Sequence, residues 1–505
     1  MHNEELSMDT TISHWINGKP QDGQSARFGS VFDPASGTEI ARVPFASSAE
    51  VDRAVAAARA AFPAWRDKSL TRRTQILFRF RGLLEEAREE LAAIVSRQHG
   101  KTLPDAQGEV QRGLEVVEFA CGAPHLLKGE NSQQVSTGVD LASVREPVGV
   151  VGCITPFNFP AMVPLWMFPI AIACGNTVVL KPSEKTPSAA IFLAELFSKA
   201  GLPEGVFNVI HGDRVAVERI LDHPDVAAIS FVGSTPVARA ISEKGTGNGK
   251  RVQALGGAKN HMLVLPDADL DVAADAAISA GYGSAGERCM AISVVVAVGD
   301  VAERLIPRLE ERIAKLHVGP ADDPAAEMGP LISREHRDRV VAYIDSGVEE
   351  GATLVADGRG LRVPGHAGGF FVGPTLFDHV EPHMHIYRGE IFGPVLCVVR
   401  VEQFTEAIDL VNRNRWANGT AIFTNDGGAA RRFQREIQVG MIGINVPIPV
   451  PLGFYSFGGW KESLFGSHSI YGPEGVHFYT RPKVVTTRWV DPVHRGVDLG
   501  FPRAE

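Results

Sequence analysis

From Glu146 onward, short apolar runs alternate with stretches of helical periodicity, and this alternation constrains the fold more than any other feature. Helices are predicted at Pro187–Ala200, Val215–Leu221 and Pro236–Lys244. The apolar runs around them are Val148–Thr155, Thr177–Leu180, Val206–Ile210, Ala228–Val232, Val252–Leu255 and Met262–Leu265. Strands separated by helices pair in parallel, so the pattern predicts an α/β fold with a doubly wound sheet. Such a sheet binds ligands at the carboxyl ends of its strands.

The remaining segments extend this architecture in both directions. A chain of 505 residues is too long for one hydrophobic core, so two or three domains are expected. Upstream, helices are predicted at 51–62, behind a capping box at Ser47–Glu50, at Thr71–His99 and at Asp105–Cys121. A second α/β segment starts near Asp267, with predicted strands at Ile292–Val298, Val395–Val401, Thr420–Thr424 and Gly440–Asn445 and helices at Val301–Leu316, Glu335–Glu349, Phe404–Asn412 and Ala429–Gln438. A late β-rich run, Val484–Trp489, could pair with another subunit.

Charge and cysteine content exclude several classes of function. The net charge is -9 and no block of like charge stands out, which argues against nucleic acid and anionic membranes as partners. The five cysteines form no CxxC pair, which argues against disulfides and zinc, and no metal site is expected. A reduced, cytoplasmic setting fits best, and the polar N-terminus does not resemble a signal peptide. The uncharged stretch 147–180 contains several prolines, so buried strand, loop and helix are predicted there rather than a membrane span.

Cys289 is the strongest candidate for a catalytic residue. It follows a glycine-rich turn, Tyr282–Gly286, and precedes the β-branched run that starts at Ile292. Arg288 is adjacent to it, and a neighbouring cation favours the nucleophilic thiolate over the thiol. The alternative is a small buried apolar side chain, which is what free cysteines usually are.

Polar residues follow two of the predicted strands, where a parallel sheet binds ligands. Asn158 lies in a loop between two prolines and could donate to an oxygen that becomes negative, although a turn asparagine could also cap its own backbone. Lys181 and Glu184 follow the next strand, where a carboxylate can accept from ribose hydroxyls; the alternative is a solvated charged loop.

Two further segments bear on dinucleotide binding. Gly233 and Ser234 stand between a strand and a helix start, where free N–H groups suit a pyrophosphate, although serine is also a common helix cap. The usual Gly-x-Gly-x-x-Gly fingerprint is absent.

Taken together, these segments resemble the NAD(P)-dependent aldehyde dehydrogenase superfamily from about Trp15 to Trp489. The resemblance rests on the collinear motifs TPFNFP, KPSE, FVGST, LGGAKN, the cysteine turn and EIFGP. It implies that Cys289 is the nucleophile and that Asn158 and the Cys289 N–H form an oxyanion hole. It implies an NAD groove formed by Thr155, Phe157, Lys181, Glu184, Lys185, Gly233, Ser234, Gly256, Glu390 and Phe392.

One departure from the superfamily concerns the residue that activates water. Hydrolytic members carry a glutamate before Leu-Gly-Gly, but here the matching position is Ala254 or, in the preferred alignment, Leu255. Neither side chain can take a proton. The thioester on Cys289 would therefore pass to another nucleophile, and a thiol such as coenzyme A needs no strong base beside it.

This apolar replacement, with GAKNH, GERCMAIS and the C-terminal motifs, resembles the CoA-acylating methylmalonate-semialdehyde (malonate-semialdehyde) dehydrogenases. The resemblance implies a substrate carboxylate, for which Arg112 and Arg288 are the expected partners because a guanidinium can bond both oxygens. Arg112 could instead pair with Glu109 or Glu115 along its helix, and Arg288 could act only on Cys289. The choice between the two semialdehydes stays open, as does the source pathway in valine, inositol or β-alanine breakdown.

The resemblance also implies a mechanism and an organisation. Oxidation of the aldehyde at Cys289 is followed by loss of CO2 and transfer to CoA, giving propionyl-CoA or acetyl-CoA; a hydrolytic enzyme with another base, such as Glu390, is the alternative. The expected parts are an NAD domain at 1–124 and 147–257, a catalytic domain at 258–467, and a small β flap at 125–146 and 468–491 that joins subunits, in a homotetramer.

Overall fold

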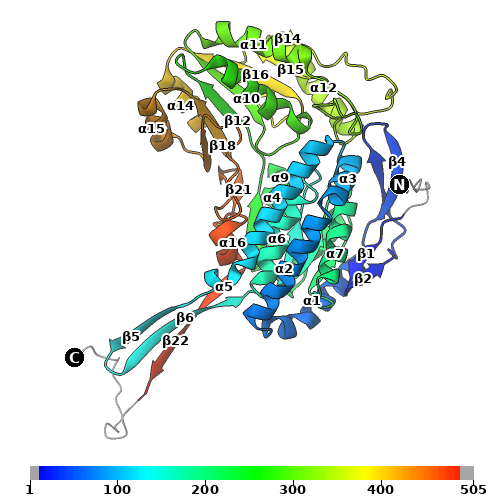
Figure 1. The fold of residues 1–505 in the computed structure, drawn as a ribbon, viewed down its shortest axis with the longest axis vertical. Helices are drawn as coiled ribbons and strands as arrows, with labels where there is room; N and C mark the ends of the chain where they lie inside the picture. The colour runs from blue at the N-terminus through cyan, green and yellow to red at the C-terminus, as the bar shows by residue number, and fades with distance from the viewer. Residues whose placement is uncertain (1–10, 490–505) are drawn as a thin grey trace.

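The computed structural model describes residues 11–489 and forms two α/β layers joined to a β arm (Figure 1). The predicted alternation of strands and helices is confirmed. The first layer contains β1 (His14–Ile16), β2 (Lys19–Gln21), β7 (Val150–Ile154), β8 (Thr177–Lys181), β9 (Phe207–Val209), β10 (Val226–Val232), β11 (Arg251–Leu255) and β21 (Leu464–Phe465), with α1 (Ser48–Arg66), α2 (Leu70–Glu86), α3 (Arg88–His99), α4 (Leu103–Cys121), α6 (Met162–Ala173), α7 (Ser188–Lys199), α8 (Arg214–Asp222) and α9 (Thr235–Gly247).

The first sheet has the strand order β2-β1-β9-β8-β7-β10-β11-β21. Its central strands β9, β8, β7, β10 and β11 run parallel, with Ile154 beside both Lys181 and Phe231, and Val232 beside Leu255. The segments that follow β7, β8, β10 and β11 therefore leave the sheet at one edge. These are the segments in which the sequence predicted ligand-binding residues.

The second sheet is built from strands later in the chain. Its order is β14-β15-β16-β13-β12-β18-β19, and all pairs but β14–β15 are parallel. The strands are β12 (Asn260–Val264), β13 (Ile292–Val298), β14 (Thr353–Ala356), β15 (Thr375–Asp378), β16 (Val395–Val401), β18 (Gly419–Phe423) and β19 (Met441–Ile444). The helices are α10 (Leu270–Tyr282), α11 (Val301–Lys315), α12 (Arg334–Glu349), α13 (His385–Arg388), α14 (Phe404–Arg413) and α15 (Gly427–Glu436).

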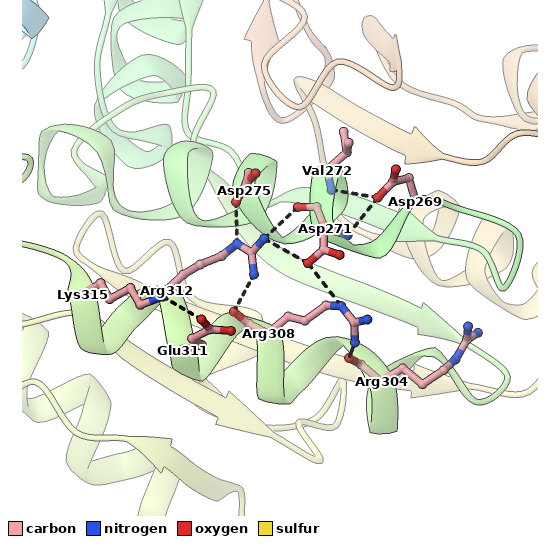
Figure 2. Close-up of polar contacts among 9 residues, drawn as sticks. All are labelled: Asp269, Asp271, Val272, Asp275, Arg304, Arg308, Glu311, Arg312 and Lys315. Atoms are coloured by element: carbon pink, nitrogen blue, oxygen red, sulfur yellow. Dashed lines mark hydrogen bonds and ion pairs between the residues drawn. The ribbon is translucent and has the colours of Figure 1, made fainter.

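Charged side chains join α10 to α11 on the outside of this second layer. Figure 2 shows Arg312 between Asp271 and Asp275, and Arg308 also reaching Asp271. Such exposed pairs contribute little stability each. The pairs hold α10 against α11, and α10 leads directly into the turn that carries Cys289.

The arm consists of β5 (Glu130–Ser136), β6 (Val139–Pro147) and β22 (Thr480–Arg488), which extend away from the body (Figure 1). The predicted late strand is therefore present, and β22 pairs antiparallel with β6 of its own chain. The strand order β22-β6-β5 leaves β22 at an edge.

The smaller elements are β3 (Phe28–Asp33), β4 (Thr38–Pro44), α5 (Ala123–Leu126), the 3-10 turn Gly283–Gly286, β17 (Trp416–Ala417), β20 (Trp460–Lys461) and α16 (Gly472–Phe478).

Two local expectations can be compared with the structure. The single helix predicted at Thr71–His99 is wrong, because α2 and α3 are separate and Ala87, with φ -94° and ψ 12°, stands between them. The uncharged stretch 147–180 forms β7, a loop, the fully buried α6 and β8, as predicted. Within residues 11–489, no helix is both long and apolar enough to cross a membrane.

Asn176 joins the first sheet to the root of the arm. Its Oδ1 accepts the Val148 and Gly149 N–H groups, at 2.8 and 3.0 Å, and its Nδ2 donates to Ala171 O and Tyr479 O, at 3.0 and 2.9 Å. The side chain is fully buried, so each of these bonds is shielded from water.

We expect Asn176→Ala to lower the free energy of unfolding by at least about 3 kcal/mol, since each buried backbone group left unpaired costs about 1–3 kcal/mol. Chemical denaturation monitored by circular dichroism measures it. Gln434→Ala on the exposed face of α15 is the control and should change stability by less than about 0.5 kcal/mol. Equal effects of the two substitutions would contradict this role of Asn176.

Candidate active site

The candidate nucleophile Cys289 lies where the two sheets face each other. It precedes β13 at the amino end of the second sheet, and its carbonyl accepts Asn260 Nδ2 at 3.0 Å and Asn418 Nδ2 at 3.1 Å. The turn before it is conformationally demanding: Ser284, Ala285 and Gly286 have φ values of 53°, 51° and 74°. Non-glycine residues in this region cost about 1–3 kcal/mol each and persist only where the surroundings hold them.

The thiol of Cys289 is not activated in this state. Burial raises its pKa to about 12, and the Glu390 carboxylate adds to the rise, whereas the N–H groups of Cys289 and Met290 and the charge of Arg288 act in the opposite direction. Arg288 therefore lowers the pKa of Cys289, as expected, but the net shift is upward and the thiol stays protonated. Loss of water around the sulfur outweighs one neighbouring cation.

Asn158 is held beside the cysteine turn. Its Nδ2 donates to Glu287 O at 2.9 Å, and the side chain is 4% exposed. Since a carboxamide nitrogen carries two hydrogens, one N–H remains for a second acceptor. The alternative of an asparagine that caps its own loop is not seen, because the partner is 129 residues away in the sequence.

A buried ion pair holds the loop that carries Asn158. Lys101 Nζ lies 2.7 Å from Glu109 Oε2 and donates to Asn158 O at 2.7 Å, and both side chains are fully buried. Glu109 Oε1 accepts the N–H groups of Ala161 and Met162, at 2.8 and 3.1 Å. Sequence reasoning missed Lys101; the only available signal was a lysine just after a predicted helix.

The other predicted groove residues come together at the carboxyl edge of the first sheet. Thr155 follows β7, and its hydroxyl is buried without a hydrogen-bond partner. Lys181 ends β8, with its Nζ 3.4 Å from Glu184 Oε2. Ser234 precedes α9 and makes no capping bond with its side chain, and Gly233 and Gly256 follow β10 and β11. This leaves one strand edge with an N-terminal helix end, a free hydroxyl and a carboxylate.

Phe157, Lys185 and Phe392 form the boundary between the groove and the second layer. The Lys185 ammonium lies 5.6 Å from the centre of the Phe157 ring and 3.4 Å from Ser333 Oγ. The rings of Phe157 and Phe392 meet edge to face at 6.0 Å, and Phe392 has φ 58°.

Glu390 lies close to Cys289 and packs against the backbone of Gly257. Its Oε1 accepts the Ala258 N–H at 2.8 Å, and a Cβ on Gly257 would lie 2.2 Å from its Oε2, so only glycine permits this approach. Burial raises the pKa of Glu390 to about 7. Both Glu390 and Phe392 line one small pocket with Cys289 and Arg288.

Leu255, the preferred match to the missing water-activating glutamate, ends β11 and is 2% exposed. It belongs to the apolar cluster that Cys289 and Met290 also join, whereas Ala254 belongs to a different cluster. Of the two alignments, Leu255 therefore has the side chain on the side of the nucleophile.

The two arginines expected to bind a carboxylate differ in their surroundings. Arg288 lies between the Cys289 pocket and an outer cavity of about 660 Å³, where its Nη2 is 2.7 Å from Asp105 Oδ1. Arg112 pairs along α4 with Glu115 at 2.9 Å, as the alternative anticipated, and is 39% exposed. Burial raises the pKa of Tyr471 and the Arg112 cation opposes this rise, which places Arg112 near that buried ring.

This arrangement fits the class of oxidoreductases, with a candidate cysteine nucleophile, an amide donor beside it and a candidate dinucleotide groove next to both. The profile of the Aldehyde dehydrogenase family matches residues 21–485. The chain belongs to the aldehyde dehydrogenase family.

Its relatives are similar over nearly their whole length. The malonate-semialdehyde dehydrogenase of Pseudomonas aeruginosa is 55% identical over 496 residues, 97% of this chain and 99% of that protein. The crystal structure of methylmalonate-semialdehyde dehydrogenase from Oceanimonas doudoroffii is 52% identical, with a TM-score of 0.95 over 96% of this chain and 99% of that one. A provisionally assigned methylmalonate-semialdehyde dehydrogenase of Sinorhizobium meliloti 1021, solved with NAD, has 51% identity and a TM-score of 0.95 over 97% of this chain and 100% of that one.

We expect Glu390→Gln to lower the pKa of Cys289, because removing a carboxylate near the sulfur removes a charge that opposes thiolate formation. Alkylation by iodoacetamide at pH 8.5 should become on the order of tenfold faster, the effect of about one pKa unit. Glu311→Gln, on the outer surface of α11, is the control and should leave the rate unchanged. An unchanged rate in Glu390→Gln would show that this carboxylate does not act on the thiol.

Proposed function

We propose that this protein catalyses the NAD-dependent, CoA-acylating oxidative decarboxylation of methylmalonate semialdehyde and malonate semialdehyde. One observation carries the proposal: beside a positioned cysteine nucleophile, the position of the usual water-activating carboxylate is the buried, apolar Leu255. The names of the relatives support the substrate class. A thioester formed on Cys289 is then transferred to a thiol rather than to water.

The strand edge fits NAD on the chemistry of its residues. Ser234 at the start of α9 suits the pyrophosphate, and Lys181 and Glu184 suit the adenine ribose. The hydroxyl of Thr155 has no hydrogen-bond partner and is proposed to make a polar contact in the groove that Phe157, Lys185, Gly233, Gly256, Glu390 and Phe392 complete. The carboxylate of Glu184 would repel a 2′-phosphate, which favours NAD over NADP. NAD supplies the acceptor for the hydride that leaves the aldehyde carbon.

In the proposed mechanism, the Cys289 thiol releases its proton to solvent and the thiolate sulfur attacks the aldehyde carbon. The free N–H of Asn158 and the Cys289 N–H stabilise the resulting oxyanion. Loss of hydride leaves a thioester whose carbonyl is β to the substrate carboxylate. The bond to CO2 breaks, its electron pair moves toward the thioester carbonyl, and the α-carbon takes up a proton. The CoA thiol then attacks and the Cys289 sulfur leaves, giving propionyl-CoA or acetyl-CoA.

Arg288 and Arg112 are proposed to hold the substrate carboxylate. Arg288 is the better placed of the two, since it lines both the Cys289 pocket and the outer cavity. Asp105 occupies one of its N–H groups, and a guanidinium has five, so a second carboxylate can bind beside it.

The organisation of the protein is also part of the proposal. The NAD domain comprises 1–124 and 147–257 and the catalytic domain 258–467; residues 1–10 of the former lie outside the described part. The segments 125–146 and 468–491 join subunits in a cytoplasmic homotetramer, residues 490 and 491 again lying outside the described part. Exposed apolar side chains on the arm support this role: Val144, Val484, Val485 and Trp489 are 41%, 64%, 44% and 84% exposed.

A hydrolytic aldehyde dehydrogenase with another base is the second candidate, and Glu390 favours it. A carboxyl with a pKa near 7 is matched to general-base catalysis at neutral pH. The two candidates differ in whether turnover requires CoA.

We expect a burst of about one NADH per active site when semialdehyde is added without CoA, and fast steady-state turnover with release of CO2 only when CoA is present. NADH absorbance and CO2 release, followed together, measure both. Cys289→Ala should abolish the burst, whereas Cys397→Ala, at a buried cysteine in the second sheet, should retain it. Full-rate formation of free acid without CoA would favour the hydrolytic candidate.

We also expect Arg288→Leu to lower kcat/KM for malonate semialdehyde at least about 30-fold more than for propanal, since losing one member of a buried charge pair costs about 2–5 kcal/mol. Steady-state kinetics with both aldehydes measure this ratio. Arg312→Leu, which removes another cation from the wall of the same outer cavity, should change both substrates equally. Equal losses for Arg288→Leu would count against a carboxylate-binding role.

A further inference from the structure

A buried group of titratable side chains lies directly behind the nucleophile turn and takes no part in the mechanism above. Its centre is Glu287, two residues before Cys289 and fully buried. The carbonyl of Glu287 accepts the amide of Asn158, and its carboxyl Oε1 accepts the Ile332 N–H at 3.2 Å. Glu287 therefore touches the oxyanion donor with its backbone and a distant loop with its side chain.

The protonation of His336, which faces this carboxyl, follows from its partners. Arg339 can only donate, so His336 Nδ1, 2.8 Å from Arg339 Nη2, must be the acceptor. The proton of the neutral ring is then on Nε2, which donates to Phe392 O at 2.7 Å. Nε2 also lies 3.3 Å from Glu287 Oε1, but its one hydrogen is used by Phe392 O, so the neutral His336 gives Glu287 no compensating charge.

The second carboxyl oxygen of Glu287 faces His99. Glu287 Oε2 and His99 Nε2 are 3.5 Å apart, and neither atom has a hydrogen-bond partner. His99 is the last residue of α3 and is fully buried, with its ring stacked on Phe157 at 6.0 Å. Two buried, unpartnered polar atoms that face each other are satisfied together if one proton lies between them.

Every charged group around this pair already has another partner. Lys101 is paired with Glu109, Lys185 bonds Ser333, Arg339 bonds His336 and Arg288 bonds Asp105. No cation within hydrogen-bonding distance of the Glu287 carboxyl is therefore found among the described residues. Burial consequently dominates and raises the pKa of Glu287 to about 8, while burial and the charges of Lys101 and Arg288 lower that of His99.

We propose that Glu287 is a positioning residue that acts as a neutral carboxylic acid, donating its proton to His99 Nε2 and thereby holding Asn158 and the cysteine turn in place. The bridge joins the end of α3, the turn before Cys289 and the loop before α12. The inference deepens the proposed function, on which its kinetic part rests. The prediction that Glu287 carries a proton does not depend on the proposed function.

The proton has a consequence for stability. An acid whose folded pKa lies above its unfolded value of about 4.3 is protonated in the folded state over a pH range in which the unfolded chain is ionised. The stabilising contribution is present below the unfolded pKa and is lost as the pH rises through about 8. Glutamine keeps the shape and can donate to His99 but has no proton to lose.

The first experiment is an infrared difference spectrum in the Glu390→Gln background, which removes the other raised carboxyl near the site. We expect the carbonyl band of a protonated carboxylic acid at pH 6.5, its loss with a midpoint near pH 8, and its absence after Glu287→Gln. This measurement needs no substrate and can be made without the Glu287 variant. A spectrum without such a band at pH 6.5 would overturn the proposal even if the protein proves to be the proposed enzyme.

The second experiment uses substitutions. The melting temperature of Glu287→Gln relative to wild type should rise between pH 5.5 and pH 9, whereas Glu118→Gln, at an exposed site on α4, should show no such trend. At pH 7, Glu287→Gln should keep kcat within about threefold, while Glu287→Leu should lose kcat at least about 50-fold with KM little changed. Parallel pH trends for Glu287→Gln and wild type, or equal kcat losses for glutamine and leucine, would contradict the proposal.

Discussion

The buried ion pair of Lys101 and Glu109 is the interaction on which the site depends. Neither charge is in contact with water, and each uses its remaining capacity on the backbone of the loop around Asn158. Buried pairs of this kind gain little net stability, because desolvation offsets their attraction. Their value here is positional: breaking the pair would strand a charge, so the loop has one strongly preferred arrangement.

With that loop in place, the remaining chemistry follows from two facing sheet edges. The carboxyl edge of the first sheet presents the groove residues, and the amino edge of the second presents Cys289 and Glu390. Protection of the proposed thioester from water conflicts with activation of the thiol, because the same burial raises the pKa of Cys289. The same apolar cluster contains Leu255, whose side chain stands at the position of the usual hydrolytic base and cannot take a proton.

Local pattern was sufficient for much of this. The alternation of apolar runs and helices located the central parallel strands of both sheets, because buried parallel strands must be continuous apolar runs. It did not predict the outer strands β1, β2 and β21 of the first sheet or β14 and β15 of the second. It failed at Ala87, where α2 ends and α3 begins without a glycine or proline to mark the break. Asn158 and Lys181 could be selected because the carboxyl ends of parallel strands are where ligands bind. Cys289 could be selected because it lies in a glycine-rich turn beside a cation.

By itself, the sequence determined the α/β class, the turn of the candidate nucleophile, the candidate strand-edge groove and the apolar residue at Leu255, since each depends on residues close together along the chain. Only the tertiary structure decided the contacts of the site. Arg288 meets Asp105 from 183 residues away, Asn158 meets Glu287 across 129, and Lys101 reaches Asn158 across 57. The physical reason is that burial and charge pairing depend on which sheet edges face each other. Residue spacing along the chain does not predict which distant side chains then come into contact.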